Sequence, residues 1–218
     1  MKVTVLDHQS TIINEFLRQI RDKNYQQNRQ LFRQNLEKCG SILAYEISKE
    51  LDYSSQAVPT SLGTKDIMLP KDELVLSCIL RAALPFFQGH LNTFEFANSF
   101  FIGAYRQSES SDGVAINLDY IAGASTEGKT VIMIDPMLAT GNSMVKSIRT
   151  ILRNGKPKKI FVSALIATPH GIEQIQKEDF GDLEIQIFTC SVDEVLNEKF
   201  YIVPGLGDAG DLCFGEKL

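Results

Sequence analysis

The residues best suited to chemistry in this sequence form a short segment from Asp135 to Ser143. The apolar run Val131 to Ile134 ends in Asp135, and small or polar residues then lead into a stretch with helical spacing. A strand-to-helix junction of this kind directs free backbone N–H groups and a helix N-terminus at one point, which makes an anion site. The hydroxyl groups of Thr140 and Ser143 would add donors. The alternative is a plain turn in which Ser143 caps the helix.

The carboxylate of Asp135 is unsuited to direct contact with a phosphate but well suited to a sugar. Ribose hydroxyls donate hydrogen bonds to a carboxylate, so Asp135 at the strand end fits a ribose beside the anion site. The segment therefore predicts a ligand that carries both a ribose and a phosphate.

Two arginines fall at the ends of predicted strands. Arg81 follows the apolar run Leu74 to Leu80, and Arg106 follows the strand predicted within Phe94 to Tyr105. The carboxyl ends of parallel strands share one edge of a sheet, so both arginines would lie beside the anion site. Arginine binds phosphate through two hydrogen bonds, as a diphosphate requires. Either arginine alone could equally be a surface residue that closes a strand.

The C-terminal segment Tyr201 to Asp211 reads Y-I-V-P-G-L-G-D-A-G-D and contains three glycines and a proline. This composition dictates a series of turns, and glycine lets a flat ligand approach the backbone closely. The alternative is an irregular C-terminal loop without a ligand.

Together these segments resemble the uracil phosphoribosyltransferase family. The resemblance covers Leu74 to Gly215 and is strongest in I-L-R-A-A-L, D-P-M-L-A-T-G and Y-I-V-P-G-L-G-D-A-G-D. The pair Asp135-Pro136 is typical of the uracil branch of the type I phosphoribosyltransferases. The resemblance implies an enzyme of pyrimidine salvage, a pentosyltransferase that converts uracil and 5-phosphoribosyl-1-diphosphate to UMP and diphosphate.

The resemblance also implies a role for each site residue. Asp135, Arg106 and Asp208 would form the catalytic group, with Mg²⁺ bound through the ribosyl diphosphate and facing Asp208. Backbone groups at Ile202, Gly207, Asp208 and Ala209 would bind uracil. The ribosyl diphosphate would contact Arg81, Arg106, Asp135, Pro136, Met137, Leu138, Ala139, Thr140, Gly141, Asn142, Ser143 and Asp208.

The chain departs from the family pattern at a few positions. Asn142 stands where the family has glycine, and we expect it to adopt a positive φ, which asparagine tolerates better than most residues. Ala83 also replaces a glycine, Leu212 replaces a basic residue, and Glu216 follows Gly215 where the family continues differently.

The elements that would hold these residues predict an α/β fold. It is a type I phosphoribosyltransferase-like, mostly parallel sheet flanked by helices, with an N-terminal helical arm and a C-terminal hood. We expect one domain made of an arm (residues 1–70, including short strands), a core sheet (71–190) and a uracil-binding hood (191–218). Helices are predicted from a Ser10 cap to about Ile20, and over Asn28–Leu51, Ala82–Leu91, Ser143–Arg153 and His170–Lys177. Further strands are predicted over Gly113–Tyr120, Lys129–Ile134, Ile160–Ala167 and Leu183–Cys190. The polar segment Gln107 to Gly113 is predicted to be a mobile loop that closes over the site.

Composition sets the remaining expectations. A net charge of -5 argues against a nucleic-acid partner and against the alternative function, a non-catalytic pyrimidine-sensing RNA-binding regulator on the same fold. Four separated cysteines suit buried reduced thiols, and the absence of a signal-peptide pattern or membrane-length apolar segment predicts a cytoplasmic protein. The histidines match nothing catalytic. The resemblance implies a homodimer or higher homo-oligomer and leaves activation by GTP open.

Overall fold

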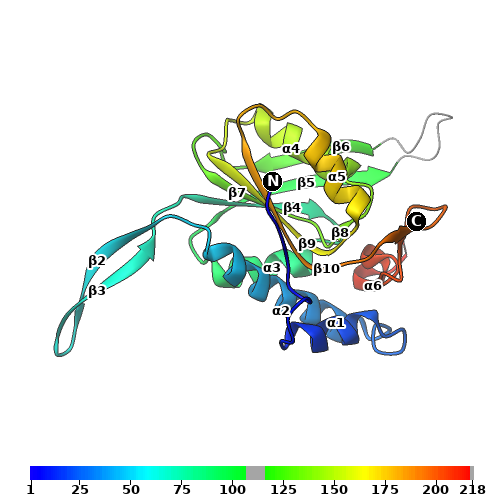
Figure 1. Cartoon of the computed structure of the whole chain (residues 1–218), viewed down its shortest axis with the longest axis horizontal. Coiled ribbons are helices and arrows are strands. Elements are labelled where there is room, and N and C mark those ends of the chain that lie inside the picture. The colour runs from blue at the N-terminus through cyan, green and yellow to red at the C-terminus, as the bar shows by residue number, and fades with distance from the viewer. Residues whose placement is uncertain (107–115, 217–218) are drawn as a thin grey trace.

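A sheet of eight strands forms the centre of the molecule (Figure 1). Of its 218 residues, the computed structural model describes 1–106 and 116–216, with backbone alone for 104–106 and 116–119. The strand order is β1-β10-β9-β7-β4-β5-β6, and β8 joins β9. Only the β5–β6 pair is antiparallel among the strand pairs of this sheet, so the predicted mostly parallel sheet is confirmed. The strands are β1 (Val3–Val5), β4 (Leu74–Leu80), β5 (Asn98–Arg106), β6 (Ile116–Gly123), β7 (Thr130–Ile134), β8 (Met137–Leu138), β9 (Lys159–Ala167) and β10 (Glu184–Val192).

Helices cover both faces of the sheet, which explains its apolar strands. Along β4, Leu74, Leu76 and Cys78 pack into one core, while Val75 and Ile79 pack into the other. Every residue of β9 is buried, because a strand covered on both faces has no solvated side. The first core includes α1 (Ile13–Arg21), α2 (Arg29–Ser48) and α3 (Leu84–Thr93), and the second includes α4 (Asn142–Arg153) and α5 (Pro169–Lys177).

The first helices differ in how well the sequence predicted their starts. α2 begins within one residue of the predicted Asn28, whose side chain caps it by accepting hydrogen bonds from the N–H groups of Gln30 and Leu31. The predicted Ser10 cap of α1 is wrong: the helix begins at Ile13 without a side-chain cap. A turn in which Asn14 N donates to Thr11 O precedes it and leaves Ser10 outside.

Gly40 lies within an unbroken α2 for a packing reason. A Cβ atom at Gly40 would lie 2.2 Å from the carbonyl oxygen of Phe86, and one at Gly89 would lie 2.0 Å from that of Glu37. The two glycines therefore let the backbones of α2 and α3 approach more closely than side chains would allow.

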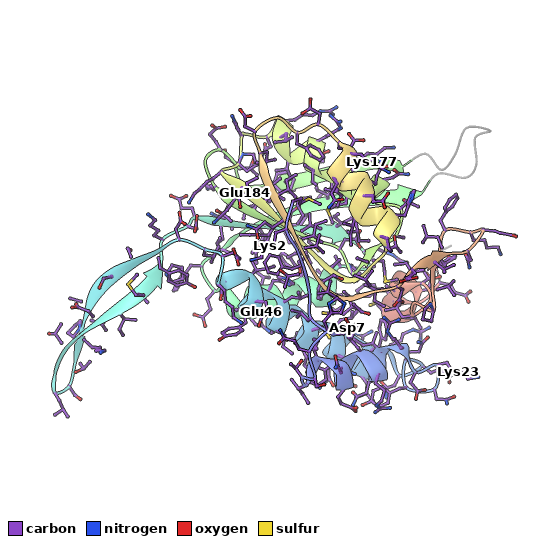
Figure 2. The ribbon with its side chains drawn as sticks, viewed as in Figure 1. Lys2, Asp7, Lys23, Glu46, Lys177 and Glu184 are labelled. Carbon is purple, nitrogen blue, oxygen red and sulfur yellow. The ribbon has the colours of Figure 1, made fainter. Side chains whose placement is uncertain are left out.

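The short strands predicted near Pro59 form one long hairpin, β2 (Tyr53–Thr60) with β3 (Gly63–Pro70). It projects from the body, and its side chains are mostly exposed (Figure 2). Its base is fixed by the Asp72 carboxylate, which accepts hydrogen bonds from Asp52 N at 2.6 Å and Lys158 Nζ at 2.8 Å. The hairpin therefore has a defined direction relative to the sheet.

The other predicted elements are confirmed with shifts of a few residues at their ends. The loop prediction for Gln107 to Gly113 lies outside the described residues, and β6 is described only from Ile116. In the described part of the chain, no helix has the length and apolar character needed to cross a bilayer.

Candidate active site

The candidate site lies where the direction of the chain across the sheet reverses. From β4 the chain passes through α3 to β5 on one side, and from β7 it passes through α4 and α5 to β9 and β10 on the other. β4 and β7 are neighbours, with Cys78 opposite Ile134. Arg81 and Asp135 directly follow these strands and share one edge, which is where α/β sheets bind ligands.

The segment from Asp135 to Ser143 is held by its carbonyl groups. Pro136 O accepts from Leu165 N at 3.1 Å and from Ile166 N at 3.0 Å. Thr168 N donates to Leu138 O at 3.0 Å, and Thr168 Oγ1 donates to Ala139 O at 2.7 Å. These bonds engage carbonyls that would otherwise repel an anion, and they anchor the segment to β9 and to Thr168, the N-cap of α5.

The residue with a left-handed backbone is Gly141, with φ +79°, and the positive φ predicted for Asn142 is wrong. The cause is the neighbouring helix: a Cβ at Gly141 would lie 2.7 Å from Gly171 O and 2.9 Å from Gln174 Cβ. Asn142 is instead the first residue of α4, and its side chain is exposed.

The start of α4 faces this segment without a side-chain cap. Gly141 is the cap residue and has no side chain to cap the helix, and Asn142 N donates to Thr140 Oγ1 at 3.4 Å, so the alternative of a turn capped by Ser143 is wrong. The first N–H groups of a helix have no partner within it, and the helix dipole makes that end positive. The N-terminus of α4 thus has the properties of an anion site.

Asp135 is half-buried at the end of β7. Its backbone N–H donates to Ser163 O at 3.1 Å, and its Oδ1 accepts from Met137 N at 3.3 Å. Burial raises the pKa of the neighbouring Cys78 thiol to about 12, and the Asp135 carboxylate adds to that shift. Cys78 therefore stays protonated and is excluded as a nucleophile.

Arg81 connects the core to the C-terminal helix α6 (Ala209–Phe214). Its Nη2 lies 3.6 Å from Asp211 Oδ1, and a Cβ at Gly210 would lie 3.9 Å from the same nitrogen. Asp208 caps α6 by accepting from Asp211 N at 3.0 Å. Arg81 and Asp208 thus both lie beside Gly210, since a Cβ there would also lie 3.1 Å from Asp208 Oδ1. Arg106 ends β5 at the same edge, but its side chain lies outside the described residues.

The hood contains β11 (Val195–Leu196) and β12 (Ile202–Val203), which pair in antiparallel fashion. A sharp turn follows, in which Gly205 has φ +54° and Gly207 has φ +96°. A Cβ at Gly205 would lie 2.1 Å from Ile202 O, so only glycine fits this turn. The four residues predicted for uracil all lie in this turn or its flanks: Ile202, Gly207, Asp208 and Ala209.

Sequence reasoning missed one polar network beneath the hood. Arg21, the last residue of α1, pairs with Asp193 just after β10, with Nη1 2.6 Å from Oδ2 and Nη2 2.9 Å from Oδ1. The residues are 172 positions apart, so no local pattern joins them. The one available signal was an acidic residue at the end of a predicted strand, as at Asp135.

A second glycine-rich segment also needed the structure to interpret. Gly123 to Thr130 reads G-A-S-T-E-G-K-T, which fits the spacing of a Walker A phosphate loop. That motif requires a helix after the loop, but here Thr130 begins β7. The segment enters that strand at the opposite edge of the sheet from Asp135, and Gly128 N donates to Lys156 O at 2.8 Å. It is a connection between strands and does not form a triphosphate site.

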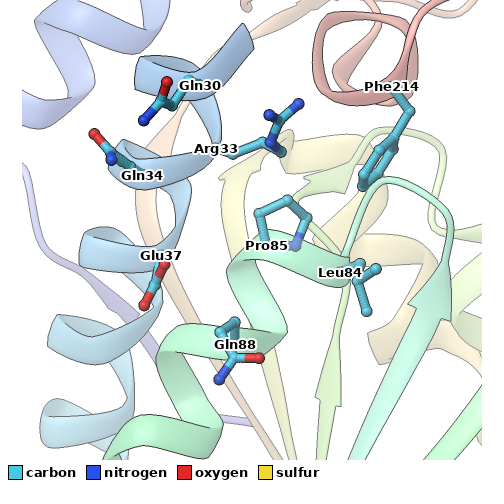
Figure 3. A pocket seen from close by; sticks show the side chains of 8 residues that line it. All are labelled: Gln30, Arg33, Gln34, Glu37, Leu84, Pro85, Gln88 and Phe214. Atoms are coloured by element: carbon cyan, nitrogen blue, oxygen red, sulfur yellow. The ribbon is translucent and has the colours of Figure 1, made fainter.

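A shallow pocket of about 310 Å³ lies away from these residues, between α2, α3 and the end of α6 (Figure 3). None of the predicted site residues lines it. Its lining residues are Gln30, Arg33, Gln34, Glu37, Leu84, Pro85, Gln88 and Phe214.

Comparison with known proteins agrees with the resemblance in the motifs. The family model described as uracil phosphoribosyltransferase matches residues 6–216. The uracil phosphoribosyltransferase of Porphyromonas gingivalis is 39% identical over 218 residues, covering 100% of both chains. That of Pyrococcus furiosus is 38% identical over 209 residues, covering 95% of this chain and 88% of the relative.

A solved structure supports the fold. A protein from Aquifex aeolicus superposes with a TM-score of 0.86 at 32% sequence identity, over 98% of each chain. With the switch-point arrangement of β4 and β7, these matches confirm the predicted type I phosphoribosyltransferase-like fold. The chain belongs to the uracil phosphoribosyltransferase family.

Proposed function

We propose that this protein is a uracil phosphoribosyltransferase, which joins N1 of uracil to C1 of 5-phosphoribosyl-1-diphosphate and releases UMP and diphosphate. The observation that carries the proposal is the position of Arg81. It follows β4 beside the Asp135 strand and lies 3.6 Å from Asp211 in the hood, so one cation adjoins both halves of the site.

The 5-phosphate would bind at the start of α4. Backbone N–H groups from Ala139 to Ser143, with the hydroxyls of Thr140 and Ser143, would receive its oxygens, while Pro136 to Leu138 hold the segment against β9. Asp135 would accept hydrogen bonds from the ribose hydroxyls. Asn142 N donates to Thr140 Oγ1 at 3.4 Å, and a phosphate oxygen would replace the hydroxyl as acceptor for this N–H.

The reaction breaks the bond between ribose C1 and diphosphate as the bond to uracil N1 forms. The transition state has oxocarbenium character, so catalysis depends on stabilising the departing negative charge more than on a strong nucleophile. Arg81 and Arg106 would take this role through bidentate contacts to the diphosphate. Asp135 would hold the ribose so that C1 faces the hood, and enclosure would exclude water that competes with uracil.

Magnesium would bind with the ribosyl diphosphate. The carboxylates of Asp208 and Asp211 lie at the start of α6 beside Arg81, and among the described residues Oδ1 of Asp211 has the ion pair with Arg81 but no hydrogen-bond partner, so hard oxygen donors would adjoin the diphosphate position. Asp208 is the residue we assign to the ion. When bound, magnesium would neutralise charge on the leaving diphosphate.

Uracil would be read by the backbone of the hood at Ile202, Gly207, Asp208 and Ala209. The positive φ values at Gly205 and Gly207 shape the turn that carries them. Backbone groups have fixed donor and acceptor polarity, which suits the O4 acceptor and N3–H donor of uracil.

We further propose that the chain works as a single domain. Its arm (1–70) and hood (191–218) share one apolar core with the sheet (71–190), since Phe32, Leu76 and Leu206 lie in the same cluster. The projecting hairpin favours a homodimer or higher oligomer, because an isolated two-stranded hairpin is marginally stable in water. Its exposed side chains Leu62, Ile67 and Met68 would be covered by a second copy.

The four cysteines are free and buried, which favours a reducing compartment such as the cytoplasm.

Activation by GTP remains an expectation from the family resemblance, and the rate of UMP formation with and without GTP tests it.

The decisive experiment is UMP formation from uracil and 5-phosphoribosyl-1-diphosphate, with Mg²⁺ and after chelation of Mg²⁺ by EDTA. We expect turnover that requires the metal. A protein that forms no UMP but retards RNA in a salt-dependent gel shift would instead be the RNA-binding regulator.

A further inference from the structure

The polar network beneath the hood joins the N-terminal arm to the turn assigned to uracil. Arg21 Nη1 donates to Asp193 Oδ2 at 2.6 Å and to Gly205 O at 3.0 Å, while Nη2 donates to Asp193 Oδ1 at 2.9 Å and Ser191 Oγ at 2.9 Å. The guanidinium thus contacts three segments at once: Ser191 in β10, Asp193 just after β10, and Gly205 in the turn. Such a planar fork cannot be reproduced by an ammonium group.

Gly205 is held through both of its backbone polar groups. Its carbonyl oxygen accepts from Arg21, and its N–H donates to Asp193 Oδ2 at 2.8 Å. Gly205 is buried, has φ +54°, and lies between Ile202 and Gly207, two of the residues assigned to uracil. The orientation of the two peptide groups that flank Gly205 therefore fixes the path of the backbone that presents the base-reading groups.

The two side chains that hold Gly205 are themselves partly buried and bonded to the sheet. The Asp193 side chain is 8% exposed and that of Arg21 is 23% exposed, so solvent screens the pair less than a surface ion pair. Asp193 N donates to Ala167 O at 2.9 Å, which ties the carboxylate to the end of β9. Ser191 lies in β10, so the guanidinium also bonds to the sheet itself.

We infer that Arg21 and Asp193, the Arg21–Asp193 clamp, are positioning residues for uracil recognition. The inference rests on the proposed function of the hood. The clamp sets the orientation of the two peptide groups that flank Gly205 and thereby the hydrogen-bonding edge offered to the base. The N-terminal arm is thus part of the base-recognition apparatus, although no arm residue is assigned to contact a substrate.

A second arm residue braces the other end of the hood. Arg33 of α2 donates from Nη1 to Cys213 O at 2.7 Å, in the last turn of α6, and it lies near Phe214 (Figure 3). The hood segment between Gly205 and Cys213, which includes Asp208, is therefore held at both ends by arginines of the arm.

The test compares Arg21→Met with Arg18→Met, a matched control. Arg18 lies one turn earlier on α1, and its ion pairs are with Glu15 and Asp22, close to it in sequence. We expect Arg21→Met to raise the KM for uracil at least about tenfold, or about 1.4 kcal/mol. The KM for 5-phosphoribosyl-1-diphosphate should stay within about threefold, and Arg18→Met should match the wild type in both.

Two further variants separate positioning from folding. Arg21→Met leaves the Asp193 carboxylate buried without its cation, which can destabilise the whole protein. In Arg21→Met/Asp193→Asn that buried charge is removed, so the melting temperature should recover while the KM for uracil stays raised, since Gly205 O still lacks its donor. Arg21→Lys should give an intermediate KM.

The outcomes are distinguishable. Wild-type protein that forms no UMP overturns the proposed function, and the clamp with it. If the wild-type protein turns over uracil, two results overturn the clamp alone. One is a normal KM for uracil in the folded double variant, and the other is a normal KM for uracil in both Arg21→Lys and Arg21→Met. Equal rises in both KM values would show a general structural role and would also overturn it.

Discussion

The guanidinium of Arg81 lies 3.6 Å from the carboxylate of Asp211, so an ion pair links the end of β4 to the first turn of α6. Both side chains are partly exposed, at 42% and 37%, which leaves the guanidinium accessible to a ligand. A diphosphate entering between the sheet and the hood would meet a cation that, in the described part of the chain, pairs with a single carboxylate.

Replacing Arg81 should weaken use of the ribosyl diphosphate. We expect Arg81→Ala to lower kcat/KM for 5-phosphoribosyl-1-diphosphate by about 10- to 150-fold, since a hydrogen bond to a charged group contributes about 1.5–3 kcal/mol. Steady-state kinetics would measure the change. In the control, Asp211→Asn keeps the guanidinium and should change the same ratio less. Equal losses in the two variants would contradict a direct role for Arg81.

Replacing Asp135 should affect rate and leave the fold intact. Asp135→Asn preserves the size of the side chain and the acceptor for Met137 N, but it removes the charge assigned to the ribose hydroxyls. We expect activity to fall at least about tenfold, the loss of roughly one charge-assisted hydrogen bond, with an unchanged melting temperature. Near-normal kinetics in this variant would remove Asp135 from the site.

Gly141 and Asn142 offer a matched pair of substitutions in the phosphate segment. Gly141→Ala places a Cβ 2.7 Å from Gly171 O at φ +79°, so we expect a loss of stability of about 1–2 kcal/mol or more and weaker binding of the ribosyl diphosphate. Asn142→Gly at the exposed first position of α4 should change the affinity less than about tenfold. Denaturant unfolding and substrate titration would measure both. A larger effect at Asn142 than at Gly141 would contradict the assignment.

The choice of base tests the hood. Cytosine reverses the donor and acceptor at two positions of the uracil edge, and each mismatch with a fixed backbone group costs about 1–3 kcal/mol. We expect kcat/KM for cytosine to be roughly 30-fold to over ten-thousand-fold below that for uracil, while 5-fluorouracil is accepted. A cytosine value within about tenfold of uracil would argue against backbone reading.

Acid should destabilise the fold through His90. This residue is fully buried: its Nδ1–H donates to Phe86 O at 2.9 Å, and Nε2 therefore accepts from Ser163 Oγ at 2.9 Å. Burial lowers its pKa from 6.5 to about 4. Between these values the unfolded chain binds a proton that the folded chain does not, so stability falls as the pH drops from 6.5 to about 4.

The lost stability from this one residue should reach about 3 kcal/mol below pH 4, and about 2 kcal/mol of it should be lost between pH 7 and pH 5. Urea unfolding at pH 7 and pH 5 would measure it in the wild type, in His90→Gln and in a control, His170→Gln, whose side chain is at the exposed start of α5. The pH dependence should shrink in His90→Gln and persist in His170→Gln. An unchanged slope in His90→Gln would assign the acid sensitivity to other groups.

Patterns close together in sequence predicted most of this fold. The unbroken apolar run of β9 signalled a strand covered on both faces, and Asn28 signalled the start of α2. Predictions failed where contacts between segments far apart in the sequence determine the local conformation. Which residue of Gly141-Asn142 takes the positive φ depends on the approach of α5, and that approach has no trace in the loop sequence.

The candidate site divides in the same way. The residues after the strands could be predicted, because parallel strands bring their carboxyl ends to one edge. Arg21 could not, because its role depends on Asp193 and Gly205, which lie 172 and 184 positions further along the chain.

The separation of Arg21 from Gly205 also has a consequence during synthesis. Arg21 is added to the chain 184 residues before Gly205, an interval of about 9–37 s at about 5–20 residues per second. For the first 172 of these residues the arginine lacks both the carboxylate and the carbonyl that will hold it. A nascent chain can therefore assemble the phosphate-binding half of its site early, but the base-binding half must wait until Gly205 has emerged.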